Sequence, residues 1–169
     1  MAKKKAPLRV LMTFSEVAPF AKTGGLADVA GALPSALREL GCDVRIVMPF
    51  YNRFVEKIAK KKLSLENLLV PLGSQMLAAD IYYVRLDDGV VVYWIRRDEF
   101  FDRSYLYGTP KGDYFDNFQR FTYFSRAVLA LCPEVKFKPN VIHAHDWQSG
   151  LVPVSYTHLT LPTSAVAWG

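Results

Sequence analysis

A glycine-containing turn between an apolar strand and an apolar-periodic helix constrains this chain more than any other feature. Residues 8–14 form a largely apolar run of strand length, and leucine and alanine side chains recur at helical spacing over residues 26–40. Residues 44–48 form a second short apolar run, so strand, turn, helix and strand follow one another. This order predicts a βαβ unit of a doubly wound, mainly parallel sheet, in which ligands bind at the carboxyl ends of the strands.

The helix predicted over residues 26–40 carries signals at its end and in its interior. Gly41 stands directly after the last apolar position, where a glycine commonly caps a helix. Pro34 lies inside the run and predicts a kink or a late start. Pro49 is expected to stop the strand that follows.

The turn itself brings a cation and two glycines together before the helix. Lys22, Thr23, Gly24 and Gly25 occupy it, and Asp28 follows in the first helical turn. Glycines permit positive φ and close approach of a ligand, while the first amides of a helix lack internal acceptors. These features predict an anion site with Lys22 as its mobile charge. The spacing matches neither common nucleotide-binding fingerprint, so a plain tight turn with Lys22 in solvent is the alternative.

The middle of the chain has a different character. Residues 52–62 have a polar, helix-like pattern, with lysines at 60–62 as a solvated helix end. β-Branched and aromatic runs at residues 81–86 and 90–95 flank Asp87, Asp88 and Gly89, which predicts a β-hairpin. A long aromatic loop over residues 100–114 is expected to follow. Its residues Tyr105 and Tyr107 are assigned to the core rather than to a binding platform.

A long helix and a further strand are expected after the aromatic loop. The helix covers residues 116–131, with Asp116 as its N-cap and Pro133 at its end. Its predicted buried stripe consists of Phe118, Phe121, Phe124, Val128 and Leu131. Residues 141–142 then read as a buried strand, and residues 148–154 can open another helix.

A polar cluster stands where this last strand ends, on the sheet edge that should also carry the lysine turn. It consists of His143, His145, Asp146 and Trp147. A metal site needs three or four ligands, and no third histidine has a fitting spacing. A nucleophile-activating pair lacks a serine or cysteine in an elbow motif. Sugar binding fits a carboxylate, an imidazole and an indole face, although a histidine at this place is also often a satisfied core residue.

Composition narrows the function classes. The 169 residues suit one domain of ordinary size, and no apolar run reaches the roughly 20 residues that a membrane helix needs. The net charge of +5 includes three lysines at positions 3–5, which read as a solvated tail rather than as a nucleic-acid groove. Cys42 and Cys132 lie far apart and read as reduced thiols. We therefore expect a cytoplasmic protein without nucleic-acid or membrane partners.

Three motifs in fixed order resemble the N-terminal domain of bacterial glycogen synthases and plant starch synthases. The first runs over residues 22–29, from Lys22 to Val29, and is preceded by Ser15 to Pro19. The second places Asp116 and Asn117 ahead of Arg120 and Phe121, and the third runs from His143 to Trp147. The resemblance covers residues 8–154.

The resemblance implies an enzyme of known type. Members are retaining glucosyltransferases that move glucose from a nucleotide-sugar, ADP-glucose in most bacteria, to the non-reducing end of an α-1,4-glucan acceptor. They consist of two Rossmann-like domains facing across a cleft, the GT-B arrangement, and require no metal or other cofactor. This chain would supply the N-terminal Rossmann-like half, with a β-hairpin insertion.

The resemblance also implies roles for single residues. Lys22 and Thr23 would bind the donor's phosphates or sugar, with Gly24 and Gly25 giving the backbone access and Asp28 beside them. Asp146 and His145 would be catalytic residues lining the reaction centre. Substrate binding would further involve His143, Trp147, Asp116 and Asn117. A general acid or base is not assigned.

The chain departs from the family pattern at both ends. Residues 1–7 form a basic N-terminal extension, residues 8–154 the glycosyltransferase domain, and residues 155–169 an atypical tail that we expect to be non-native. The resemblance implies that a C-terminal domain carries most nucleotide contacts in the family, and we expect this chain to lack it. The chain alone is therefore expected to be inactive.

Other functions stay open at this level. A sucrose- or trehalose-forming GT-B enzyme shares the glycine turn. A non-catalytic sugar- or nucleotide-binding module would fit a chain with one domain, and a metal hydrolase would use His143, His145 and Asp146.

Overall fold

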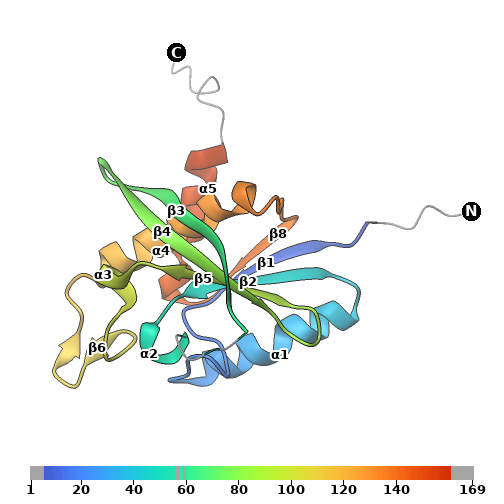
Figure 1. The fold of residues 1–169 in the computed structure, drawn as a ribbon, viewed down its shortest axis with the longest axis horizontal. Helices are drawn as coiled ribbons and strands as arrows, with labels where there is room; N and C mark the ends of the chain where they lie inside the picture. Colours follow the sequence, from blue (N-terminus) through green and yellow to red (C-terminus); the bar gives the residue numbers. More distant parts are fainter. Residues whose placement is uncertain (1–5, 56–57, 59, 161–169) are drawn as a thin grey trace, which may run out of the picture.

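The computed structural model describes residues 6–55, 58 and 60–160, and its centre is a six-stranded sheet in the order β3-β4-β5-β2-β1-β8 (Figure 1). The lysines at 3–5 and residues 161–169 lie outside the described residues. The strands are β1 Arg9–Thr13, β2 Asp43–Pro49, β3 Lys62–Leu72, β4 Gln75–Arg85, β5 Val91–Arg96 and β8 Val141–Ala144. A two-stranded ribbon is formed by β6 Gly108–Thr109 and β7 Gly112–Asp113. The helices are α1 Gly25–Glu39, α2 Asn52–Val55, α3 Asp98–Phe101, α4 Asn117–Glu134 and α5 Leu151–Thr160.

The predicted α/β class with a mainly parallel sheet is confirmed. Strand β1 pairs in parallel with β2 and β8, and β2 pairs in parallel with β5. Helix α1 connects β1 to β2 in one direction along the sheet, whereas α4 connects β5 to β8 in the other. Right-handed crossovers then place these two helices on opposite faces, so the sheet is doubly wound.

Helix α1 follows from its sequence except at the proline. Its last turn closes with the Gly41 amide donating to the Arg38 carbonyl (2.9 Å) and the Cys42 amide to the Leu37 carbonyl (3.1 Å). This is a Schellman cap, and Gly41 supplies the required positive φ of 86°. The late start expected from Pro34 is wrong, because α1 begins at Gly25 and runs through the proline.

The middle of the chain corrects two predictions. The helix expected over residues 52–62 is a single described turn, α2, and Lys62 already begins β3. The hairpin around Gly89 is confirmed, but β4 begins at Gln75 and pairs with β3 from Gln75 to Tyr83, which was not predicted. Pro71 argues against a strand when the sequence is read alone, because proline is found mainly in edge strands. Strand β3 lies at the edge of the sheet, where proline is tolerated.

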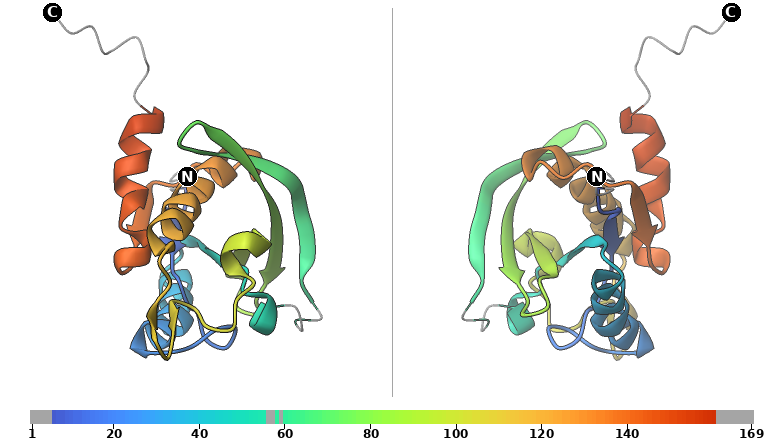
Figure 2. Two further views of the ribbon diagram at one scale, coloured as in Figure 1. Left: turned by 90° about the vertical axis from the view of Figure 1, so that its left-hand side faces the viewer. Right: turned by 90° about the vertical axis from the view of Figure 1, so that its right-hand side faces the viewer.

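Helix α4 fills the space between α5 and the curved β3–β4 hairpin (Figure 2). Phe121, Phe124, Val128 and Leu131 are buried as predicted, whereas Phe118 is 68% exposed. Pro133 does not end the helix, which continues to Glu134. A proline late in a helix removes one hydrogen bond without stopping the residue that follows it.

The last elements follow β8. This strand is at the edge of the described sheet and is only partly covered, with Val141 43% exposed, so the prediction of a buried strand is wrong. A short 3-10 turn, Trp147–Ser149, leads into α5, which crosses the expected boundary after Val154 without a break. Within the described residues no helix is long and apolar enough to cross a membrane.

Candidate functional site

The lysine turn and the histidine-aspartate cluster leave the sheet at the same edge. Strands β1 and β8 are parallel neighbours, and Thr13 at the end of β1 is paired with Ala144 at the end of β8. The pairing continues one step further, because the His145 amide donates to the Thr13 carbonyl at 3.1 Å. The two loops that carry Lys22 and Asp146 therefore begin side by side at the carboxyl ends of these strands.

The glycine turn is held by an internal carboxylate. Glu16, 4% exposed, accepts hydrogen bonds from the Thr23 amide, from the Gly24 amide at 3.2 Å and from the Thr23 hydroxyl at 3.0 Å. The two turn amides just before α1 are thus already occupied. The amides of Gly25 and Leu26, in the first turn of α1, have no acceptor within the helix.

The two glycines of the turn provide open space beside the backbone, but they do not adopt a left-handed conformation. Gly24 has a φ of −147°, and neither Gly24 nor Gly25 is among the described glycines with positive φ, so that expectation is wrong. A methyl group added at either position would meet no atom within 4 Å. The backbone is therefore open to a ligand at these two residues, in agreement with the close approach that the sequence predicted.

Lys22 projects at the surface beside this opening. Its ammonium group lies 2.6 Å from the Asp28 carboxylate, and the two side chains are 54% and 61% exposed. An ion pair this exposed contributes little to stability, about 0–1 kcal/mol. Lys22 can therefore exchange Asp28 for another anion at small cost.

Asp146 is held in an unusual backbone conformation. Its φ of 63° and ψ of 175° lie outside the regions that L-residues normally populate, and its carboxylate accepts a hydrogen bond from the Trp147 amide at 2.7 Å. Such conformations cost about 1–3 kcal/mol and occur often at functional sites. The bend presents an exposed carboxylate at the sheet edge.

His145 is packed as a neutral imidazole. Its ring stacks on Phe14 with centroids 4.0 Å apart and lies 3.9 Å from the His143 ring, and its buried Nε2 has no hydrogen-bond partner among the described residues. Burial, with a smaller contribution from His143, lowers the pKa of His145 from the usual 6.5 to about 4. His145 is thus uncharged at neutral pH. Within the described residues, no group of three or more His, Cys, Asp or Glu side chains is arranged to hold a metal ion.

This pKa shift predicts acid sensitivity. Because the folded pKa of His145 lies near 4 and the unfolded one near 6.5, the unfolded state binds the proton more tightly between these values. Stability should therefore fall as the pH decreases from about 6.5 to about 4. Urea unfolding of the wild type and of His145→Phe, which keeps the stack on Phe14, measures the effect. The loss between these pH values should be smaller in the variant, and equal losses would contradict the shift.

Tyr107 connects the two clusters. Its hydroxyl lies 2.7 Å from the Ser15 hydroxyl and 3.2 Å from the Glu16 carboxylate, to which it donates. Its ring lies 6.1 Å from the half-exposed Trp147, which also meets the edge of Phe121 at 5.1 Å. Burial raises the pKa of Tyr107 above its ordinary value, so the hydroxyl keeps its proton.

Asp116 and Asn117 have internal partners. Asp116 is 7% exposed and pairs with Arg103 at 2.8 and 2.5 Å, which holds the pKa of its carboxyl below the usual value. It stands at the N-cap position of α4, but its side chain makes no capping bond. The Asn117 amide donates to the Tyr107 carbonyl at 2.8 Å. In this structure both residues hold the aromatic segment, residues 102–116, against α4.

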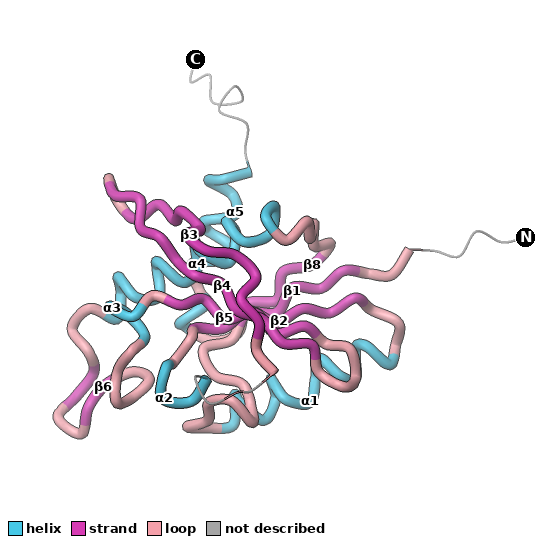
Figure 3. The backbone as a smooth tube through the Cα atoms, in the orientation of Figure 1, coloured by secondary structure: helices cyan, strands magenta, loops and turns pink. Residues whose placement is uncertain are grey.

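Arg120 completes this frame from inside the core. It is fully buried and donates to the carbonyls of Phe100 (2.7 Å) and Leu106 (3.0 Å) and to the Asn117 side-chain oxygen (2.6 Å). The aromatic segment, with its small β6–β7 ribbon, is otherwise mostly loop (Figure 3). Its position beside the lysine turn therefore depends on these side-chain contacts.

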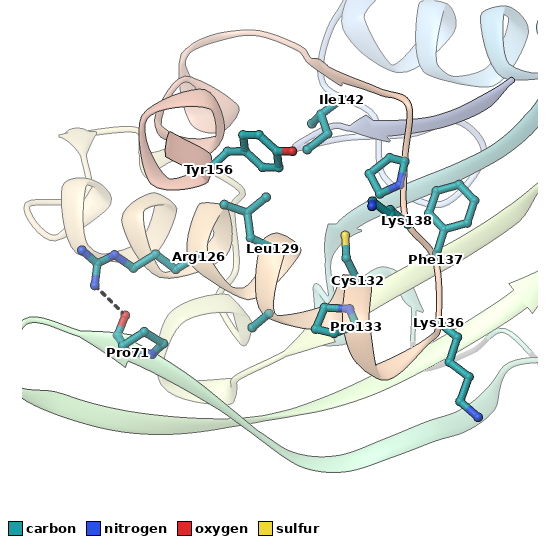
Figure 4. Close-up of a pocket in the computed structure, with 12 residues that line it drawn as sticks. Pro71, Arg126, Leu129, Cys132, Pro133, Lys136, Phe137, Lys138, Ile142 and Tyr156 are labelled. Atoms are coloured by element: carbon teal, nitrogen blue, oxygen red, sulfur yellow. Dashed lines mark hydrogen bonds between the residues drawn. The ribbon is translucent and has the colours of Figure 1, made fainter. Parts of the chain in front are cut away.

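Two cavities of the described structure differ in their position and in the residues that line them. One of about 340 Å³ lies beside the turn, between Thr23, the α2 residues Arg53 and Phe54, and residues 104–108 of the aromatic segment. A larger one of about 670 Å³ lies near the start of β8, lined mainly by apolar residues of α4 and the loop after it (Figure 4). The smaller cavity belongs to the candidate site, because it adjoins the glycine turn.

The sequence alone indicates no role in the site for Glu16 and places Tyr107 in the core. The signal for Glu16 was available, since a turn with exposed amides needs an acceptor and Glu16 is the one carboxylate in its loop. The contacts of Tyr107 and Arg120 span many residues and had no such signal.

The fold and this edge of the sheet define the class of the domain, a Rossmann-like half of a GT-B glycosyltransferase. The catalytic domain of starch synthase IV from Arabidopsis thaliana, solved with ADP and acarbose bound, superimposes with a TM-score of 0.79 at 31% identity. The match covers 94% of this chain and 31% of that one.

Sequence comparisons give the family. The sequence model of the family described as starch synthase catalytic domain matches residues 9–166, so the chain belongs to this family. A glycogen synthase of Syntrophotalea carbinolica is 49% identical over 150 residues, and one of Geobacillus stearothermophilus 46% identical over 146. These matches cover 86% of this chain but only 30% and 29% of the two relatives. The chain thus spans less than a third of their length.

Proposed function

We propose that this chain forms the N-terminal half of a retaining glucosyltransferase that moves glucose from ADP-glucose to the non-reducing end of an α-1,4-glucan. The observation that carries the proposal is the meeting of the lysine turn and Asp146 at one sheet edge, tied together by Tyr107. The ADP and acarbose bound to the starch synthase IV domain support a nucleotide and a glucan as ligands of such a fold.

The proposed chemistry follows from the charges at the turn. When the glycosidic bond to the donor breaks, negative charge develops on the diphosphate leaving group. Lys22 and the positive end of the α1 dipole stabilise that charge, and the Gly24–Gly25 backbone leaves room for the phosphates. Thr23 and Asp28 orient the turn and the lysine.

The wall opposite the turn is proposed to hold the sugar. Asp146 lines the reaction centre and accepts hydrogen bonds from sugar hydroxyls, with neutral His145 behind it and His143 beside it. The half-exposed face of Trp147 packs on a sugar ring. Asp116 and Asn117 act indirectly, by holding the aromatic segment in place.

The domain boundaries belong to the same proposal. Residues 8–154 constitute the transferase domain, preceded by a basic extension and followed by a non-native tail. We further propose a cytoplasmic location, which the two free cysteines, Cys42 and Cys132, support.

A hybrid enzyme tests the function. Residues 8–154 of this chain replace the matching segment of the Geobacillus stearothermophilus glycogen synthase, which is 46% identical over 146 residues. We expect the hybrid to elongate a maltooligosaccharide with ADP-glucose, measured by ADP release and by product length. The purified 169-residue chain should have no such activity under the same conditions. A folded hybrid without activity, or an active isolated chain, would contradict the proposal.

A further inference from the structure

The Glu16 carboxylate is buried and satisfied entirely by neutral donors. It receives the Thr23 and Gly24 amides, the Thr23 hydroxyl and the Tyr107 hydroxyl, and none of the described lysines or arginines forms an ion pair with it. Hydrogen bonds to an ionised acceptor are about twice as strong as those between neutral groups. Four such bonds at one side chain fix the segment that donates them.

The turn has no capping side chain of its own. Gly24 occupies the N-cap position of α1 and has no side chain with which to cap the helix. A glycine pair is also the most flexible backbone that a chain can carry. Glu16, eight residues before Gly24, supplies the missing acceptor from the other side of the loop.

Tyr107 extends this arrangement to the second cluster. Its hydroxyl contacts Glu16 and Ser15, and its ring centroid lies 6.1 Å from that of Trp147. A displacement of Glu16 therefore affects both the amides before α1 and the aromatic wall next to Asp146.

We infer that Glu16 is a positioning residue, which fixes the Lys22–Gly25 turn for donor phosphates and, through Tyr107, sets its distance from Trp147. The inference rests on the proposed function for its consequence in catalysis. Glu16 is not a catalytic residue, because it is buried and its oxygens are engaged by internal donors.

Amide hydrogen exchange of the complete 169-residue chain tests the positioning directly. In the wild type, the Thr23 and Gly24 amides should be protected although Thr23 is exposed. Glu16→Gln keeps the shape but turns an amide group toward donors, so exchange at these two residues should rise on the order of tenfold. Tyr107→Phe, which removes one of four donors, should raise it by a smaller factor. Glu39→Gln, on the exposed end of α1, is the matched control and should leave it unchanged.

The hybrid enzyme supplies the second readout. Glu16→Gln should raise the KM for ADP-glucose on the order of tenfold with a smaller change in kcat, since donor binding uses the fixed turn. Unchanged exchange at Thr23 and Gly24 in Glu16→Gln, or an unchanged KM in an active hybrid, overturns the inference. If the wild-type hybrid is inactive, the proposed function fails, and the exchange measurement alone decides whether Glu16 holds the turn.

Discussion

Replacing Arg120 by methionine is expected to lower the free energy of unfolding by about 3 kcal/mol, because one buried and two partly buried acceptors lose their donor. Methionine fills much of the volume of the arginine side chain but has no donor for the carbonyls of Phe100 and Leu106 or for the side-chain oxygen of Asn117. Each buried acceptor left unpaired costs about 1–3 kcal/mol. Part of this total cost is offset, because the variant no longer has to bury a charged guanidinium group.

Urea unfolding followed by circular dichroism measures this loss. Arg126→Met is the matched control on the same helix, because Arg126 is only partly buried and its described bond is to one carbonyl, that of Pro71, at 3.1 Å. We expect the control to lose about 1 kcal/mol or less. Equal losses in the two variants would mean that Arg120 does not hold the aromatic segment.

The parallel part of the fold was predictable from sequence because its signals are local. The apolar strands, the leucine periodicity of α1 and the Gly41 cap each lie within a few residues of what they determine. The same holds for the Asp-Gly turn between β4 and β5. Together these elements place the Lys22 and Asp146 loops at one edge without any knowledge of side-chain contacts.

The errors occurred where tertiary contacts outweigh local preference. Strand β3 contains a proline and few fully buried residues, and it is stabilised by pairing with β4 and packing on α4. Phe118 has the helical spacing of the buried stripe but lies at the first turn of α4, where the described residues leave it exposed. Such outcomes depend on partners distant in sequence, which no window of residues contains.

In the candidate site too, features with a local sequence signal were predicted, and features set by tertiary contacts were not. The residue types were found because a lysine next to glycines and a carboxylate after a strand have recognisable chemistry. The acceptor that occupies the turn, Glu16, was not predicted, although a turn with exposed amides needs an acceptor and Glu16 is the one carboxylate in its loop. The positive groups left for an anion are Lys22 and the Gly25 and Leu26 amides at the start of α1.

Lys22 is the residue with the largest expected effect on activity, because it is the full positive charge among these groups. In the hybrid enzyme, Lys22→Met should lower kcat/KM about 10²–10³-fold, the range found when one group that stabilises transition-state charge is removed. The turn amides cannot compensate, because Glu16 holds two of them. The loss should appear chiefly in kcat if Lys22 acts on the developing charge of the leaving diphosphate.

The stability of the protein should hardly change when Lys22 is replaced. The ion pair with Asp28 is exposed, so Lys22→Met should shift the free energy of unfolding by no more than about 0.5 kcal/mol. Lys138→Met is the matched control, an equally simple loss of one exposed lysine just before β8, away from the carboxyl ends of the strands. Steady-state kinetics with varied ADP-glucose separates the two variants. A Lys22→Met hybrid within threefold of wild type would place charge stabilisation elsewhere and leave the lysine turn without its proposed role.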